Sequence, residues 1–136
     1  MNVKPIVYHW TKGENVHGIM NEGLHISGGV HMNGVYMTSD AAQYHGWTGK
    51  THLFGIDLRG LEKHIVLMPD KKWVISEDAI PPENIFLVGG EFQSETELRS
   101  TVTNRKNEFL NSFHKTPYKL RTEKFRTYTP PQIQIN

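Results

Sequence analysis

The sequence predicts one α+β domain in which most strands lie in the middle of the chain and the helices lie early and late. The chain has 136 residues, which is enough for a single hydrophobic core but short for two. Between residues 34 and 88, short runs rich in β-branched and aromatic residues alternate with glycine and proline turns. Apolar residues recur at helical spacing after Glu14 and again after Glu95.

Each strand is predicted from its composition and from the turn beside it. We expect strands at residues 3–8, 34–38, 51–58, 64–68, 72–76 and 85–88. The later strands are separated by turns at Pro69-Asp70 and at Pro81-Pro82. Alternating residues in the segment 51–58 predict a strand with one apolar face.

The helices are predicted from apolar spacing and from their end signals. The first begins at Glu14 and ends at Gly23, a residue type that commonly terminates helices. Asp40 is expected to cap a short helix that begins at Ala41. Residues 95–114 predict a long helix with an apolar stripe and a basic polar face.

The C-terminal part of the chain differs in character from the rest. From Thr116 onward, three prolines and scattered charges favour an extended or partly disordered tail. We therefore divide the chain into a core at residues 1–90 and a second part at residues 91–136. This second part is a C-terminal helix and a basic extension, packed on the same domain or projecting from it.

The charge is divided along the chain. Residues 1–98 carry seven Lys and Arg against twelve Asp and Glu, a net charge of −5, whereas the remainder carries eight against two, a net charge of +6. The basic residues of this second part lie between Arg99 and Arg126. This region either contacts an acidic partner or nucleic acid, or forms a solvated surface that neutralises the acidic body.

The composition excludes several kinds of site. Without cysteine, the chain has neither a disulfide framework nor a cysteine zinc site. Its eight histidines include no His-x-x-x-His pair, so we expect no metal site. The common glycine-rich phosphate loops are also missing. No segment approaches the roughly 18 apolar residues of a membrane span, and no signal peptide begins the chain, so we expect a cytoplasmic protein without a membrane partner.

Four local features follow one another in an informative order. They are a strand ending in Tyr8-His9-Trp10-Thr11, a helix ending in Glu22-Gly23-Leu24-His25-Ile26, a strand at Gly34-Val35-Tyr36-Met37-Thr38-Ser39-Asp40, and a turn at Ile80-Pro81-Pro82-Glu83-Asn84-Ile85. This order resembles the ADP-ribosyltransferase superfamily, particularly its diphtheria-toxin and poly(ADP-ribose) polymerase branch. The resemblance extends from about Tyr8 to Val88. It implies a small split-sheet ADP-ribosyltransferase-like core, here followed by a C-terminal helix and a basic tail, that takes NAD as a substrate.

The resemblance also implies roles for individual residues. His9 would hydrogen-bond the nicotinamide ribose, and the backbone of Trp10 would hold the carboxamide. Tyr36 would stack on the nicotinamide ring, and Tyr44 would form a second aromatic wall. Thr11 and Ser39 would support the cofactor-binding set. Each residue also suits an ordinary role in a loop, a core or a turn.

The third catalytic position departs from the family pattern. In the polymerase branch a glutamate opens the strand that corresponds here to Lys72-Trp73-Val74-Ile75, and no acid stands at its start. Glu77, at the far end of that strand, is the first candidate for the catalytic carboxylate, followed by Glu95 or Glu97.

Three functions remain open at this stage. The first is an NAD-dependent mono-ADP-ribosyltransferase, or an NAD-cleaving toxin or phage effector of that fold, that modifies a protein or nucleic acid. The second is a catalytically inactive transferase fold that binds a partner through its basic C-terminal region. The third is a relative of the RNA 2′-phosphotransferases, which share a similar Gly-Val-Tyr-Met-Thr strand. Phosphate would then be held by Lys12, Lys71 or Lys72, or by the distant basic tail, because Arg59 is the one arginine before Arg99.

Overall fold

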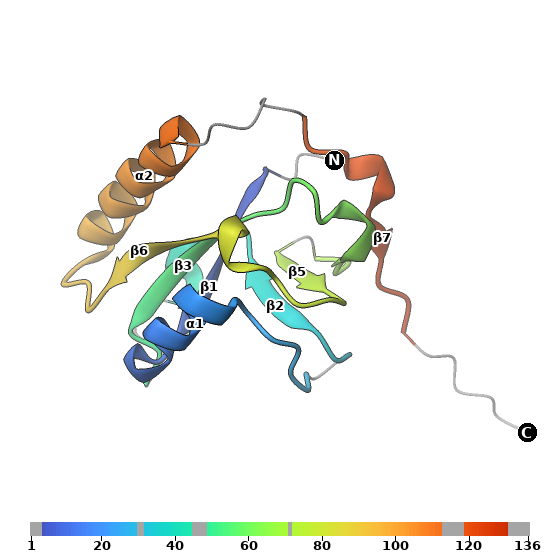
Figure 1. The fold of residues 1–136 in the computed structure, drawn as a ribbon, viewed down its shortest axis with the longest axis horizontal. Coiled ribbons are helices and arrows are strands. Elements are labelled where there is room, and N and C mark those ends of the chain that lie inside the picture. The colour runs from blue at the N-terminus through green and yellow to red at the C-terminus, as the bar shows by residue number, and fades with distance from the viewer. Residues whose placement is uncertain (1–3, 30–31, 45–48, 71, 113–118, 131–136) are drawn as a thin grey trace, which may run out of the picture.

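The computed structural model describes residues 4–29, 32–44, 49–70, 72–112 and 119–130. Within these residues the chain is a mixed α+β fold with a seven-stranded sheet and two α-helices, which confirms the predicted class (Figure 1). The strands are β1 (Ile6–Thr11), β2 (Val35–Thr38), β3 (His52–Asp57), β4 (Ile65–Leu67), β5 (Trp73–Ser76), β6 (Ile85–Gly90) and β7 (Arg126–Thr127). The helices are α1 (Val16–Glu22) and α2 (Glu95–Ser112).

The sheet has the strand order β6-β3-β1-β2-β5-β4-β7. Neighbouring strands are antiparallel except β4 and β7, which run parallel. β1 pairs with β3 along its whole length, from Ile6 to Thr11. Between β1 and β2, the described ladder consists of one pair, Tyr8 opposite Thr38. The two central strands therefore part beyond Tyr8, and the sheet opens there.

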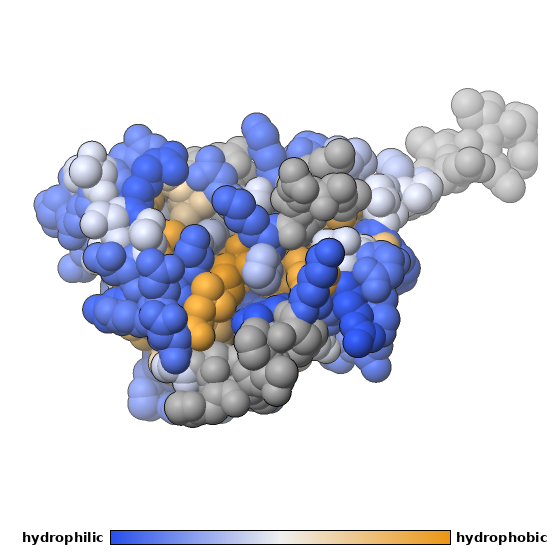
Figure 2. Space-filling model, turned by 90° about the horizontal axis from the view of Figure 1, so that it is seen from above, coloured by the Kyte–Doolittle hydropathy of each residue, from blue (hydrophilic) through white to orange (hydrophobic). Residues whose placement is uncertain are grey.

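Each face of the sheet is covered by one of the helices. Val16 and Ile19 of α1 pack on a buried cluster that includes Val7, whereas Leu98 of α2 lies in a second cluster with Tyr8. Val7 and Tyr8 are consecutive in β1, so they point to opposite faces of the sheet. Seen from above, polar residues cover most of the surface, with a narrow band of hydrophobic residues between them (Figure 2).

The end of α1 is fixed against the turn that precedes β6. Gly23 terminates the helix with a φ of 84°, which favours glycine, and its N–H donates to the carbonyl of Ile19. A Cβ at this position would lie 2.1 Å from the backbone oxygen of Ile80. Leu24 and Ile80 then exchange two backbone hydrogen bonds, both 2.9 Å long. This contact anchors the segment after α1.

Several predicted elements occur with shifted bounds. The first strand begins at Ile6 rather than at residue 3 and continues to Thr11. The helix expected from Glu14 starts as a 3-10 turn at Gly13–Asn15 before α1. The strand expected to have one apolar face, β3, is buried on both faces because it lies between β1 and β6 with a helix on each side.

The prediction of an extended or partly disordered tail is wrong for residues 119–130. Leu120 is buried in the main core, and the N–H of Arg121 donates to the carboxylate of Glu62 at 3.1 Å. β7 extends the sheet at β4, and the N–H of Tyr128 donates to the carbonyl of Leu67 at 2.8 Å. Burial of one leucine and pairing at a sheet edge thus hold this segment in place. No helix within the described residues is long and apolar enough to cross a membrane.

Candidate functional site

A cleft of about 490 Å³ opens where the central strands part. Its walls come from β1, β2, the start of β5, the segment after α1 and the turn before β3. The lining residues are His9, Leu24, His25, Ser27, Gly28, Gly29, Val35, Tyr36, Lys50 and Trp73. This volume lies within the range of small-molecule sites, and the lining combines aromatic surface with a few polar groups, as such sites do.

His9 lies at the centre of this cleft. Its Nδ1 is 2.7 Å from the carbonyl oxygen of Tyr36. A carbonyl can only accept, so Nδ1 carries the hydrogen and Nε2 of the neutral ring is an acceptor. Burial lowers the pKa of His9, and the positive charge of Lys50 lowers it by a smaller amount. The hydrogen bond to Tyr36 acts in the opposite direction and raises this pKa. His9 is therefore a neutral imidazole with a fixed tautomer and an acceptor nitrogen.

The strand geometry explains why this bond forms. Tyr8 is opposite Thr38, and the same register would bring Trp10 opposite Tyr36. The strands separate before Trp10 and Tyr36 can pair. The carbonyl of Tyr36 instead accepts a hydrogen bond from the imidazole N–H of His9. A side chain thus bridges the two strands at the point where the backbone ladder stops.

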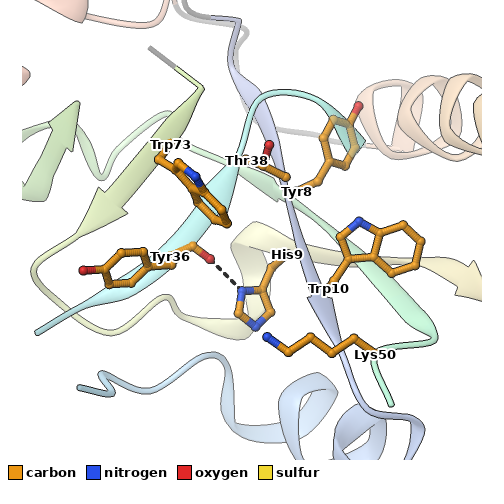
Figure 3. A pocket seen from close by; sticks show the side chains of 7 residues that line it. All are labelled: Tyr8, His9, Trp10, Tyr36, Thr38, Lys50 and Trp73. Carbon is orange, nitrogen blue, oxygen red and sulfur yellow. Dashed lines mark hydrogen bonds between the residues drawn. The ribbon is translucent and has the colours of Figure 1, made fainter. Parts of the chain in front are cut away.

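Lys50 is a site residue that the sequence analysis did not identify. It lines the cleft and also a smaller pocket of about 70 Å³ beside it, together with His9 and Trp73. Figure 3 shows its side chain running toward the imidazole, with the amino group close to the ring. Lys50 follows a glycine in a turn, and this short segment matches no sequence motif for a binding site. Its contact with His9 depends on the pairing of β1 with β3.

Tyr36 is held from several directions. Its hydroxyl donates to the carbonyl of Met32 at 2.9 Å and accepts from the N–H of Met32 at 3.1 Å. Its ring meets that of Trp73 edge-on, with centroids 6.1 Å apart. The backbone of Gly29 lies against the ring, since a Cβ there would be 2.2 Å from it. The half-buried aromatic surface in the cleft is therefore preorganised.

Trp73 and Trp10 contribute differently from one another. Trp73 stands at the start of β5, one residue after Lys72, which occupies the position of the glutamate in the resembled family, and it forms an aromatic wall of the cleft. The indole of Trp10 points to the other side of β1 (Figure 3). There it is buried, donates to the carbonyl of Ala41 at 2.8 Å and meets Phe92 edge-on. The predicted role of Trp10 concerned its backbone, which borders the opening of the sheet.

The supporting residues are placed as follows. Thr11 is buried and accepts a hydrogen bond from Asn15 at 3.3 Å. Ser39 is exposed, and its N–H donates to the carbonyl of Lys72 at 3.0 Å, outside the lining of the cleft. Tyr44 ends the short 3-10 helix Ala41–Tyr44, and its side chain lies outside what the structure describes. Asp40 caps that helix as predicted, accepting from the N–H of Ala42 at 3.1 Å.

Glu77 is placed apart from the cleft lining. It follows β5, and its carboxylate forms an ion pair with Arg126 of β7. The structure thus brings together His9, Tyr36 and the backbone of Trp10, but it directs the side chain of Glu77 toward the C-terminal strand. Among the described residues, no carboxylate lines the cleft.

A second, shallower groove of about 360 Å³ adjoins the cleft and shares the imidazole of His9 with it. It runs along α1, and its lining includes Thr11, Glu14 and Glu22. His25 lies 3.6 Å from the carboxylate of Glu22 at its edge. Acidic side chains therefore line this groove beside His9, whereas Lys50 lines the cleft and is not part of the groove lining.

Within the parts of the chain that the structure describes, no three or more His, Asp or Glu side chains are grouped so as to hold a metal ion. Comparison of the sequence with models of known protein families gives no match, and comparison with curated proteins gives none either.

Proposed function

We propose that this chain is an NAD-dependent mono-ADP-ribosyltransferase, or an NAD-cleaving effector of that kind, acting on a protein or nucleic acid. The observation that carries the proposal is the fixed acceptor nitrogen of His9 within an aromatic cleft. A neutral imidazole with its Nδ1–H engaged presents Nε2 to a hydroxyl, which is what a ribose offers. The aromatic walls from Tyr36 and Trp73 suit a flat ring such as nicotinamide.

The opening of the sheet supplies a further argument. The described ladder between β1 and β2 is the pair Tyr8 and Thr38, and the backbone of Trp10 lies beyond it, next to His9. The N–H and C=O of a strand residue match the acceptor and donor of a carboxamide. Ribose, carboxamide and pyridine ring would then each have a complementary group.

Cleavage of the nicotinamide–ribose bond gives the sugar oxocarbenium character, which fixed negative charge stabilises. The carboxylates lining the groove beside His9 belong to Glu14 and Glu22, and Glu77 is held by Arg126. In this proposal the enzyme binds NAD through the cleft and takes its electrostatic assistance from the acidic groove or from a rearranged Glu77. The rate would then be modest, because no described acid is preorganised in the cleft itself.

The test is release of nicotinamide from NAD, or transfer of labelled ADP-ribose, by the purified chain and by His9→Ala. We expect His9→Ala to lower either activity by at least about 100-fold, the scale of a lost oriented catalytic hydrogen bond. His64→Ala is the matched control, because His64 lies in the 3-10 turn Glu62–His64 and outside the cleft lining. Activity that survives His9→Ala unchanged contradicts the proposal.

A second function, a catalytically inactive fold that binds a partner, is favoured by the lack of a described carboxylate in the cleft. NAD that binds without release of nicotinamide would select this function. Its basic C-terminal region is partly engaged internally, since Arg99 pairs with Glu95, Arg105 with Glu108 and Arg126 with Glu77. Binding of nucleic acid by this region would weaken steeply with added salt.

The phosphotransferase alternative draws less support from the structure. Arg59 forms a two-point contact with Asp57, including a bond of 2.8 Å, and Asp57 is buried. This guanidinium is thereby committed to a structural pair. Lys71 lies outside the described residues, and Lys72 lies outside the lining of the cleft. Lys12 is also outside the described lining of the cleft.

A further inference from the structure

We propose that Lys50 binds the 5′-phosphate of the nucleotide whose ribose is held by His9, so that the cleft selects phosphorylated ligands over nucleosides. The proposal rests on the proposed function, because it takes His9 as the ribose contact. It adds a binding residue for a part of the ligand, the phosphate, to which the proposed function assigns no residue.

The position of Lys50 is the first argument. Lys50 lines both the main cleft and the smaller pocket beside it, as do His9, Tyr36 and Trp73. Its amino group lies beside the imidazole (Figure 3). In a nucleotide, the 5′-phosphate is joined to the ribose through a single methylene. A cation next to the group that holds the ribose is therefore within reach of that phosphate.

The charge of the surroundings is the second argument. Among the described residues that line the two pockets, Lys50 is the one lysine or arginine, and the lining holds no Asp or Glu. Its ammonium disfavours protonation of His9. A positive charge that lowers the affinity of its neighbour for a proton equally raises the affinity of the site for an anion. The carboxylates of Glu14 and Glu22 line the adjoining groove and neither of these two pockets, so the pockets lined by Lys50 suit a phosphate better than the groove does.

A second lysine runs past the same turn. The Cε of Lys12 lies 3.7 Å from the position a Cβ would take on Gly49, the residue before Lys50. Gly49 has a φ of 78°, which favours glycine, so the turn that presents Lys50 depends on this residue. The side chain of Lys12 thus passes the residue that precedes Lys50. Lysine is a common phosphate-binding residue, acting as a point charge.

The experiment compares two ligands that differ by a phosphate alone, nicotinamide mononucleotide and nicotinamide riboside, by titration calorimetry at fixed low salt. We expect the full chain to bind the mononucleotide about 10- to 100-fold more tightly than the riboside, the range of a hydrogen bond to a charged group. Lys50→Gln should abolish this preference by weakening the mononucleotide alone. Lys50→Arg should retain most of it, and Lys63→Gln, at an exposed position of the 3-10 turn Glu62–His64, should leave it unchanged.

The other outcomes separate the two proposals. If neither ligand nor NAD binds to the wild-type chain, the proposed function fails and the role of Lys50 fails with it. If both ligands bind equally and Lys50→Gln changes neither, the proposed function stands and the phosphate role is overturned. If Lys50→Gln weakens both ligands to the same extent, Lys50 acts through His9 or through the shape of the cleft, and the phosphate role is again overturned. Thermal unfolding of each variant verifies that it is folded.

Discussion

Nδ1 of His9 lies 2.7 Å from the carbonyl oxygen of Tyr36, and this bond joins two strands where their described backbone pairing ends. It sets the tautomer of the imidazole and connects the ribose-binding group to the strand that carries the aromatic wall. The pKa of His9 is lowered chiefly by burial. Protonation would place a charge in the buried site and remove the acceptor at Nε2.

The first prediction concerns pH. Because the folded pKa of His9 is below its ordinary value near 6.5, the unfolded chain binds more protons as the pH falls through that range. The contribution of His9 to the free energy of unfolding is thus complete above about pH 6.5 and declines as the pH falls toward the folded pKa. NAD affinity should decline over the same interval. Urea unfolding and titration calorimetry between pH 8 and pH 5 measure both trends.

The control for this prediction is His9→Asn, whose side-chain amide can still donate to the carbonyl of Tyr36 but does not titrate. Other titratable groups face His9, namely Lys50, His25, Glu14 and Glu22. Their effects remain in the variant, so the difference between the two curves isolates His9. Identical pH dependence in the two proteins would contradict the prediction.

The second prediction uses two adjacent glycines. Gly29→Ala would place a Cβ 2.2 Å from the ring of Tyr36, so the ring or the loop must move. At Gly28 such a Cβ would lie 3.8 Å from Oδ1 of Asn33, an ordinary contact. We expect Gly29→Ala to weaken NAD binding at least about tenfold by displacing the aromatic wall, and Gly28→Ala to change it little. Equal effects of the two substitutions would show that the contact with Tyr36 does not matter.

The third prediction tests the folded tail. Leu120 is buried in the main core, so Leu120→Ala should lower the free energy of unfolding by about 2–4 kcal/mol. Leu110 on α2 is 37% exposed, and its replacement by alanine should cost less than about 1 kcal/mol. Urea unfolding of the two variants makes the comparison. A loss no larger for Leu120→Ala than for Leu110→Ala would mean that residues 119–130 are not part of the core.

Local patterns in the sequence predicted most of the fold. The spacing of apolar residues and the glycine and proline signals indicated β2, β4, β5, β6 and α2 to within a few residues. The pairing of distant strands could not be derived in this way, because the register of β1 against β3 depends on contacts across the whole core. The tail was misjudged for a related reason. Its composition is polar and proline-containing, and one buried leucine outweighs that composition only when the core is already formed.

The residues of the candidate site likewise fall into those that local motifs predicted and those that depend on distant strand pairing. His9 and Tyr36 came from local motifs, and the structure brings them together. Trp73 and Lys50 were not predicted as site residues. Trp73 reaches the cleft because β5 pairs with β2, and Lys50 reaches it from the turn before β3, the strand that pairs with β1. Sequence spacing also could not show that Glu77 is paired with Arg126, which lies 49 residues away.

The last prediction concerns Glu77, the sequence-based candidate for the catalytic carboxylate. Its pairing with Arg126 leaves its side chain 37% exposed and that of Arg126 55% exposed, so the pair should contribute only about 0–1 kcal/mol to stability. Stabilisation of an oxocarbenium requires a charge close to the sugar, because electrostatic energy falls with distance and with solvent screening. Wherever wild-type activity is measurable, we therefore expect Glu77→Gln to leave nicotinamide release within about twofold, the spread of a substitution remote from the reacting atoms. Glu22→Gln, in the groove beside His9, should lower it more. A loss of at least about 100-fold in Glu77→Gln alone, with stability retained, would instead mean that Glu77 leaves Arg126 and reaches the substrate.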